Sequence, residues 1–207
     1  MYKEYTYNST ELDHTSKYIH QKLIDSLIEY KGCKILDLGC GNGSLVNELN
    51  KLGFDAYGAD ASETGIAIAK NSFGNKFFHI DVNKNTPQEI LDLKFDIIIS
   101  TEVIEHLYSP QNFVDMTLNI LKNSKEKVLI ISTPYHGYLK NLLISILNKW
   151  DKHWSPEWEG GHIKFWSYNT LRNFLTNKGF SDFKFIGCGR YPYLWKSMLI
   201  ISKYNAH

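Results

Sequence analysis

Compact apolar runs alternate with longer amphipathic segments over the first two thirds of the chain. The runs are residues 33–38 (CKILDL), 55–60 (DAYGAD), 76–80 (KFFHI), 95–100 (FDIIIS) and 127–132 (KVLIIS), and each predicts a strand. The continuous apolar character of the last run is typical of a strand buried on both faces. Helical spacing predicts helices over residues 18–28, from Ser44, from Glu63 and over residues 112–121. This alternation favours a parallel sheet with helices on both faces.

The last third of the chain breaks the alternation. Residues 135–166 combine an amphipathic segment (YLKNLLISILNKW) with an aromatic, glycine-containing loop. We expect an insertion over the carboxyl edge of the sheet, with residues 139–150 packed in a core. A helix over residues 167–178 then leads to two strand patterns, FSDFKFIGCG and KSMLIIS, which are close enough to pair antiparallel. The predicted fold is a single α/β domain over residues 1–207, doubly wound, with a mainly parallel seven-stranded sheet and an antiparallel final strand; residues 1–30 would form an N-terminal lid or helix.

Composition indicates a globular protein and narrows its partners. The 207 residues are 43% hydrophobic and carry a formal net charge of +1, so no global field attracts nucleic acid or an anionic membrane. A small-molecule partner is therefore expected, without nucleic acid and without stable membrane association, while the oligomeric state stays open. Three scattered cysteines, Cys33, Cys40 and Cys188, lack metal-ligand spacing and favour a reducing, cytoplasmic location.

A glycine-rich turn follows the first predicted strand. In ILDLGCGNGSL, the glycines at 39, 41 and 43 permit a tight turn and a close backbone approach to a ligand. Ser44 replaces the third glycine of the dinucleotide pattern, and Asp37 is ill placed for a phosphate, so a nicotinamide enzyme is disfavoured. Asp60 and Asp81 end the next two predicted strands. Three acids at successive strand ends suit a nucleoside that bears a cation.

The turn and its acids resemble the first motif of class I S-adenosylmethionine-dependent methyltransferases, acidic-x-G-x-G-x-G. This resemblance implies a Rossmann-like methyltransferase fold and S-adenosyl-L-methionine as cofactor. It also implies a set of cofactor-binding residues: Asp37, Gly39, Gly41, Gly43, Asp60, Ala61, Asp81, Val82, Thr101 and Glu102. Within that set Asp60 would bind the ribose, Asp81 would flank the adenine, and Glu102 would line the methionine part.

The segment TEVIEHL, residues 101–107, places two carboxylates and an imidazole behind a predicted strand. With STP at 132–134 and GHIKFWS at 161–167, it resembles the ubiquinone-biosynthesis O-methyltransferases and the enzymes that methylate the terminal ribose of small RNAs. The resemblance implies a divalent cation held by Glu102, Glu105, His106 and, further along the chain, His162. Glu102, Glu105 and His106 would share one face of a helical turn, and their donor atoms suit magnesium or manganese.

The chemistry of this cluster stays open at the level of sequence. His106 is expected at the reacting centre, either as a ligand of the cation or as the base that takes a hydroxyl proton. Alternatively, Glu105 only favours a helix start while His106 packs. Four tryptophans of the insertion, Trp150, Trp154, Trp158 and Trp166, either close a pocket on an apolar ligand or form a small satellite core.

The expected activity is O-methylation of a small molecule. One alternative is methylation at nitrogen or carbon without a metal, in which Glu102 only orients the substrate. A second alternative is a regulator that binds S-adenosylmethionine without catalysis.

Overall fold

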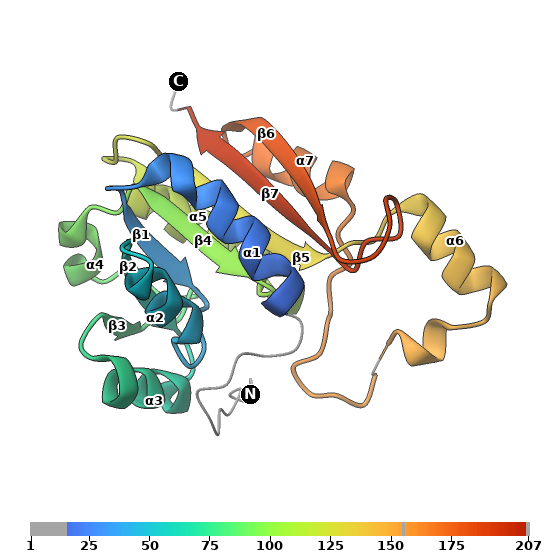
Figure 1. The fold of residues 1–207 in the computed structure, drawn as a ribbon, viewed down its shortest axis with the longest axis horizontal. Coiled ribbons are helices and arrows are strands. Elements are labelled where there is room, and N and C mark those ends of the chain that lie inside the picture. Colours follow the sequence, from blue (N-terminus) through green and yellow to red (C-terminus); the bar gives the residue numbers. More distant parts are fainter. Residues whose placement is uncertain (1–15, 155, 206–207) are drawn as a thin grey trace.

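The computed structural model describes residues 16–154 and 156–205, shown in Figure 1. The part of the expected N-terminal lid before Ser16 lies outside the described residues. The strands are β1 Lys34–Leu38, β2 Asp55–Asp60, β3 Phe77–His79, β4 Ile97–Thr101, β5 Val128–Pro134, β6 Phe180–Cys188 and β7 Ser197–Tyr204. The helices are α1 Ser16–Leu27, α2 Ser44–Lys51, α3 Glu63–Phe73, α4 Gln88–Leu93, α5 Pro110–Leu121, α6 Tyr138–Ile146 and α7 Tyr168–Thr176, with short 3₁₀ turns η1 Ile28–Tyr30, η2 Ile104–His106 and η3 Trp150–Lys152.

The seven strands form one sheet in the order β3-β2-β1-β4-β5-β7-β6. Strands β1 to β5 pair parallel, and β7 pairs antiparallel with both β5 and β6. The prediction of a mainly parallel seven-stranded sheet with an antiparallel final strand is confirmed. Since the sheet is parallel from β3 to β5, the carboxyl ends of these strands meet at one edge, which brings the predicted acids together.

Each face of the sheet is covered by its own hydrophobic core. Consecutive strand residues face opposite sides, so Ile97 belongs to one core and Ile98 to the other, and both are fully buried. On one face α1 to α3 contribute side chains such as Leu23 and Leu49; on the other, α5 and α7 contribute Phe113 and Leu171. This double burial explains why the central strands appear in the sequence as continuous apolar runs.

Helix α4 was not predicted. It spans six residues, and Ile90 is its one fully buried side chain, so its sequence carries no clear helical period. Helix α5 begins at Pro110, two residues before the predicted start, because proline is well suited to the first turn of a helix.

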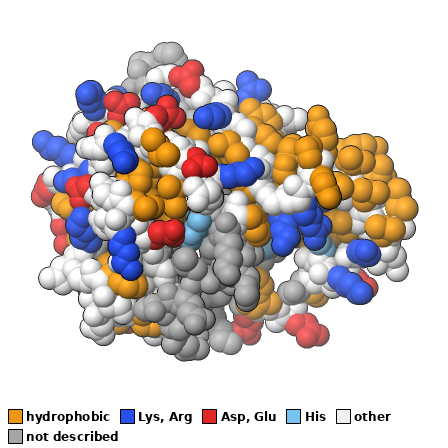
Figure 2. Space-filling model, viewed as in Figure 1, with side chains coloured by type: hydrophobic (Ala, Val, Ile, Leu, Met, Phe, Trp, Pro, Cys, Tyr) orange, Lys and Arg blue, Asp and Glu red, His pale blue; other side chains and the backbone are white. Residues whose placement is uncertain are grey.

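The expectation that residues 139–150 pack in a core is wrong for most of that segment. Helix α6 projects away from the sheet (Figure 1), and within it only Lys140 and Ile144 are buried. Leu139, Ile146 and Leu147 are exposed. Figure 2 shows hydrophobic side chains gathered over this projecting part of the molecule. Among the helices of residues 16–154 and 156–205, none combines the length and apolar character needed to cross a membrane.

Candidate functional site

The glycine turn joins β1 to α2 at the carboxyl edge of the sheet. Gly39 has a φ of +97°, and a Cβ there would lie 2.4 Å from Cγ2 of Val103. Gly43 has a φ of +79°, and its Cβ would meet the ring of Phe77 at 2.6 Å. Both positions therefore need glycine for the backbone angle and for space. The amide of Gly41 donates to Oδ2 of Asp60 at 2.8 Å, which ties the turn to the end of β2.

Asp37 lies in β1 beneath the turn and is almost fully buried. Its Oδ1 has no hydrogen-bond partner among the described residues. Burial, and then the charge of Asp60, raise the pKa of Asp37 to about 8. A cationic group in contact with Asp37 would satisfy the oxygen and restore the charged carboxylate. The buried carboxylate of Asp37 therefore fits the ammonium of a cofactor at this position.

Asp60 and Asp81 follow at the ends of the next two strands. Asp60 accepts hydrogen bonds from the amides of Gly41 and Ser62, at 2.8 and 2.7 Å, and burial is the main cause that raises its pKa. Asp81 is half-buried, two residues after β3, and its Oδ1 accepts from the amide of Asn83 at 2.9 Å. The structure thus places the predicted cofactor residues along one edge, formed by β1 to β4 and the residues that follow these strands: Asp37, Gly39, Gly41, Gly43, Asp60, Ala61, Asp81, Val82, Thr101 and Glu102. Their roles toward a cofactor stay predictions.

Glu102 does not share a helical turn with Glu105 and His106, so that expectation is wrong. Strand β4 ends at Thr101, Glu102 takes a left-handed φ of +54°, and the 3₁₀ turn begins only at Ile104. Glu102 therefore lies outside the 3₁₀ turn that carries Glu105 and His106.

The side chain of Glu102 is instead bound by two hydroxyl groups. Oγ of Ser132 donates to Oε1 at 2.9 Å, and Oγ of Ser197 donates to Oε2 at 3.3 Å. Burial raises the pKa of Glu102 to about 7, which the two hydroxyl groups and Lys140 partly counteract.

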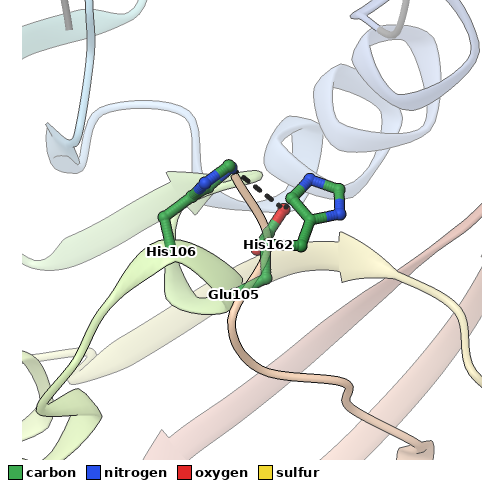
Figure 3. A group of neighbouring side chains, drawn as sticks. All are labelled: Glu105, His106 and His162. Carbon is green, nitrogen blue, oxygen red and sulfur yellow. Dashed lines mark ion pairs between the residues drawn. The ribbon is translucent and has the colours of Figure 1, made fainter. Parts of the chain in front are cut away.

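Glu105, His106 and His162 form a separate cluster, shown in Figure 3. One ligand atom from each residue lies within 4.8 Å of the other two. Oε1 of Glu105 lies 4.0 Å from Nε2 of His106 and 4.0 Å from Nε2 of His162, and it has no hydrogen-bond partner in the described part of the chain. Burial, and then the charge of Glu102, raise the pKa of Glu105 well above its usual range. A buried carboxylate facing two imidazole nitrogens fits a divalent cation.

Backbone carbonyls hold the two histidines in place. The carbonyl of Gly160 can only accept, so Nδ1 of His106, 2.6 Å away, carries a hydrogen, and Nε2 is the ring nitrogen on the side of Glu105. The carbonyl of Glu105 accepts from the amides of Ile163 and Lys164, both at 2.9 Å, which brings His162 back to the cluster.

Further contacts affect the protonation of His162 and the orientation of the Glu105 carboxylate. Burial, and then His106 and His153, lower the pKa of His162 to about 4, so its ring is neutral. Oγ1 of Thr133 donates to Oε2 of Glu105 at 3.0 Å. Neither the Thr133 contact nor the Gly160 contact was predicted; STP marked the region, and nothing in the sequence marked Gly160.

Two tryptophans of the insertion, Trp158 and Trp166, lie in different surroundings. The ring of Trp158 lies 5.7 Å from that of His106 and 6.1 Å from that of His162, and the residue is 45% exposed. Trp158 therefore forms a wall beside the cluster. Trp166 instead packs on the core, with its ring 5.5 Å from Phe174.

Known proteins are similar to this chain in sequence. A family model described as a methyltransferase domain matches residues 12–184. The ubiquinone biosynthesis O-methyltransferase of Bartonella quintana (strain Toulouse) is 30% identical over 164 residues, covering 78% of this chain and 66% of that protein. The protein of the same name from Ruegeria sp. (strain TM1040) is 26% identical over 171 residues, covering 81% and 68%. The chain thus spans about two thirds of the length of these relatives.

Solved structures agree in fold. Magnesium protoporphyrin IX methyltransferase from Synechocystis PCC 6803, with bound SAH, has a TM-score of 0.60 at 22% identity, covering 96% of this chain and 90% of that chain. The small RNA methyltransferase HEN1 has a TM-score of 0.67 at 21% identity, covering 99% and 27%. The sheet order, the glycine turn above a buried acid and the family match over residues 12–184 lead to one conclusion: the chain belongs to the S-adenosylmethionine-dependent methyltransferases.

Proposed function

We propose that the protein transfers a methyl group from S-adenosylmethionine to a hydroxyl group of a small molecule that carries two adjacent hydroxyls. The observation that carries this proposal is the buried Oε1 of Glu105, without a hydrogen-bond partner among the described residues and 4.0 Å from two imidazole nitrogens. The names of the curated relatives support O-methylation. The near balance of 23 basic and 22 acidic residues favours a small molecule over nucleic acid.

The carboxyl edge of the sheet would bind the cofactor. When bound, S-adenosylmethionine supplies an electrophilic methyl group on a sulfonium. Asp37 would pair with its ammonium, Asp60 with Ala61 would take the ribose hydroxyls, and Asp81 with Val82 would flank the adenine. The glycine turn would allow the cofactor to approach its backbone closely. Thr101 ends β4 and Glu102 follows it, and both would border the methionine part.

Glu105, His106 and His162 would hold a magnesium or manganese ion. Such an ion would supply Lewis acidity that lowers the pKa of an acceptor hydroxyl. Thr133 keeps the Glu105 carboxylate oriented toward the two rings, since its hydroxyl occupies the other oxygen. Trp158 covers the cluster on one side and would reduce access of water to the reacting hydroxyl.

His106 would act at the reacting centre in either of its two predicted roles. The Gly160 carbonyl holds the ring in the tautomer whose Nε2 is free to accept. That nitrogen can bind a cation, or, without one, can take the hydroxyl proton as a general base. Both roles depend on the same hydrogen bond to Gly160.

Calorimetric titration of Mn²⁺ into protein saturated with S-adenosylhomocysteine tests the cation site. We expect one saturable site in the wild type and none in Glu105→Gln, because the amide cannot provide the buried charge. Glu102→Gln is the matched variant outside the cluster. Retained binding in that variant assigns Glu102 to the serine hydroxyls, and loss equal to that of Glu105→Gln makes Glu102 a ligand.

Turnover separates the proposed reaction from its alternatives. We expect S-adenosylhomocysteine to form with a catechol and Mn²⁺, and much less to form after Glu105→Gln. Metal-independent methylation of amines would instead support nitrogen transfer. Tight cofactor binding without turnover on a panel of hydroxyl, amine and carbon acceptors would support a regulator.

A further inference from the structure

A buried ammonium group lies in the insertion and forms no ion pair with the residues that the structure describes. Lys140 in α6 is only 6% exposed. Its Nζ donates to the carbonyl oxygens of Tyr135 at 2.7 Å and Lys196 at 3.2 Å. An ammonium has three N–H donors. Among the described residues, the third N–H of Lys140 has no hydrogen-bond acceptor, and no carboxylate lies within 4.0 Å of Nζ. Glu102 acts on this ammonium through its charge, but the two form no ion pair. Because desolvating a charge is costly, an anion in direct contact would further stabilise the Lys140 ammonium.

Arg190 acts on this ammonium through its charge, and Lys196 provides one of its carbonyl partners. Lys196 precedes β7, and its Nζ lies 5.0 Å from the centre of the Tyr18 ring. Arg190 follows β6, is exposed, and contributes with burial to lowering the pKa of Lys140 to about 8. Lys140 therefore remains protonated near neutral pH. Neither Arg190 nor Lys196 forms an ion pair with any residue that the structure describes. Figure 2 shows basic side chains beside the apolar surface of the projecting insertion.

Lys140 lies on the acceptor side of the site. Its carbonyl partners follow β5 and precede β7, and Ser132 and Ser197 of the same two strands bind Glu102. The charge of Lys140 also contributes to the lowering of the pKa of His136 to about 4, after burial. The glycine turn and Asp37 belong to β1, which β4 separates from β5. The ammonium is thus displaced from the glycine turn and Asp37 toward the insertion.

We propose that the methyl acceptor carries a carboxylate in addition to its adjacent hydroxyls, and that Lys140 binds this carboxylate, with Arg190 at the rim. This inference rests on the proposed O-methylation. A single buried ammonium with one remaining N–H matches a monoanion better than a phosphate, which needs several donors. Lys140 could instead bind the carboxylate of the methionine part of the cofactor. Measuring cofactor affinity separately distinguishes the two carboxylates.

The test compares 3,4-dihydroxybenzoate with its neutral isostere 3,4-dihydroxybenzamide, under saturating S-adenosylmethionine and Mn²⁺. We expect the wild type to prefer the benzoate in kcat/KM by about tenfold or more, the size of a charge-assisted hydrogen bond in a buried site. Lys140→Met should abolish that preference and change the rate on the benzamide by less than about threefold. Lys149→Met, an exposed lysine that follows α6, is the matched control and should retain the preference.

Further variants distinguish loss of the charge from a folding defect and from a role of Lys140 in binding the cofactor. Arg190→Gln should reduce the preference by about two- to threefold at low salt and less at high salt, because a rim charge is screened. Lys140→Arg should restore part of the preference. The affinity of Lys140→Met for S-adenosylhomocysteine should equal that of the wild type.

Several outcomes would overturn the inference. Equal rates of the wild type on both compounds would refute it and leave the proposed O-methylation intact. Equal loss on both compounds in Lys140→Met would assign Lys140 a purely structural role. Weaker binding of S-adenosylhomocysteine to Lys140→Met would assign the lysine to the cofactor carboxylate. Failure of both compounds to be methylated under any condition would refute the proposed function and this inference together.

Discussion

At the scale of single residues, two buried carboxyl groups determine the chemistry of the site. Asp37 and Glu105 each keep one oxygen without a hydrogen-bond partner in the described part of the chain. Leaving such an atom unsatisfied costs about 1–3 kcal/mol. Both lie at the carboxyl edge of the sheet, one in β1 and one after β4. The ligands proposed here, an ammonium and a divalent cation, would provide the missing partners.

The raised pKa of Asp37 predicts how the stability of the ligand-free protein depends on pH. The folded-state pKa is about 8, above the ordinary value of 3.8. The neutral carboxyl therefore contributes stability that is complete below about pH 4 and is lost as pH rises toward 8, by at most about 1.4 kcal/mol per pH unit. We expect the melting temperature of the wild type to fall by several degrees relative to Asp37→Asn between pH 5 and pH 8.

Thermal denaturation at pH 5, 6.5 and 8 measures this difference. Asp81→Asn, which changes a half-buried acid at the end of a neighbouring strand, is the control and should follow the wild type. Parallel pH profiles for the wild type and Asp37→Asn would show that Asp37 is ionised in the folded protein and would contradict the prediction.

At the scale of elements, the side chain of Thr133 connects the end of β5 to the 3₁₀ turn η2. Thr133 donates to Glu105, and its replacement by valine keeps the volume but leaves both oxygens of the carboxylate without a donor. We expect Thr133→Val to weaken Mn²⁺ binding by about 10- to 100-fold, the range observed when a residue that orients a metal ligand is changed. Calorimetric titration measures the affinity.

A matched substitution distinguishes this effect from the general loss of a buried hydroxyl. Thr117 in α5 is equally buried, and its Oγ1 donates to the carbonyl of Phe113 within the same helix. Thr117→Val should leave Mn²⁺ affinity unchanged. Comparable weakening in both variants would mean that Thr133 acts through stability rather than through Glu105.

The projecting helix α6 has two isoleucines in different environments. Ile144 is 8% exposed, whereas Ile146 is 68% exposed. Ile144→Ser should reduce the free energy of unfolding by about 2–4 kcal/mol, because it creates a cavity and buries a hydroxyl. Ile146→Ser should change it by less than about 0.5 kcal/mol. Urea denaturation measures both, and a large loss for Ile146→Ser would show that this face of α6 is covered in solution.

At the scale of the whole molecule, one sheet edge serves two separate tasks. The ends of β1 to β3 provide Asp37, Asp60 and Asp81, while the segment after β4 and the insertion provide the cation cluster. The order β3-β2-β1-β4-β5 places β1 next to β4, so the two groups are neighbours. Because the parallel strands all end at this edge, cofactor and acceptor would meet there without a second domain.

Much of this arrangement was predictable from local patterns. Strands β1, β2, β4 and β5 were predicted to within about two residues at each end, since side chains buried on both faces leave apolar runs that depend on few distant contacts. Asp37 and the glycines were recognised because a tight turn restricts residue type at adjacent positions. Helix α4 was missed because six residues with one buried side chain leave too weak a period.

Sequence alone therefore determined the α/β class, the family, the glycine turn with its buried acid, and the residue types available for a cation site. Only the tertiary structure decided which of those residues meet. His106 and Gly160 are 54 positions apart, and the hydrogen bonds from Ile163 and Lys164 to Glu105 cross a similar separation. The side chain of Glu102 is likewise held by Ser132 and Ser197, and the ammonium of Lys140 by the carbonyl of Lys196, all from other strands and loops. Periodicity records which faces are buried, but pairing between distant segments depends on packing that no local pattern contains.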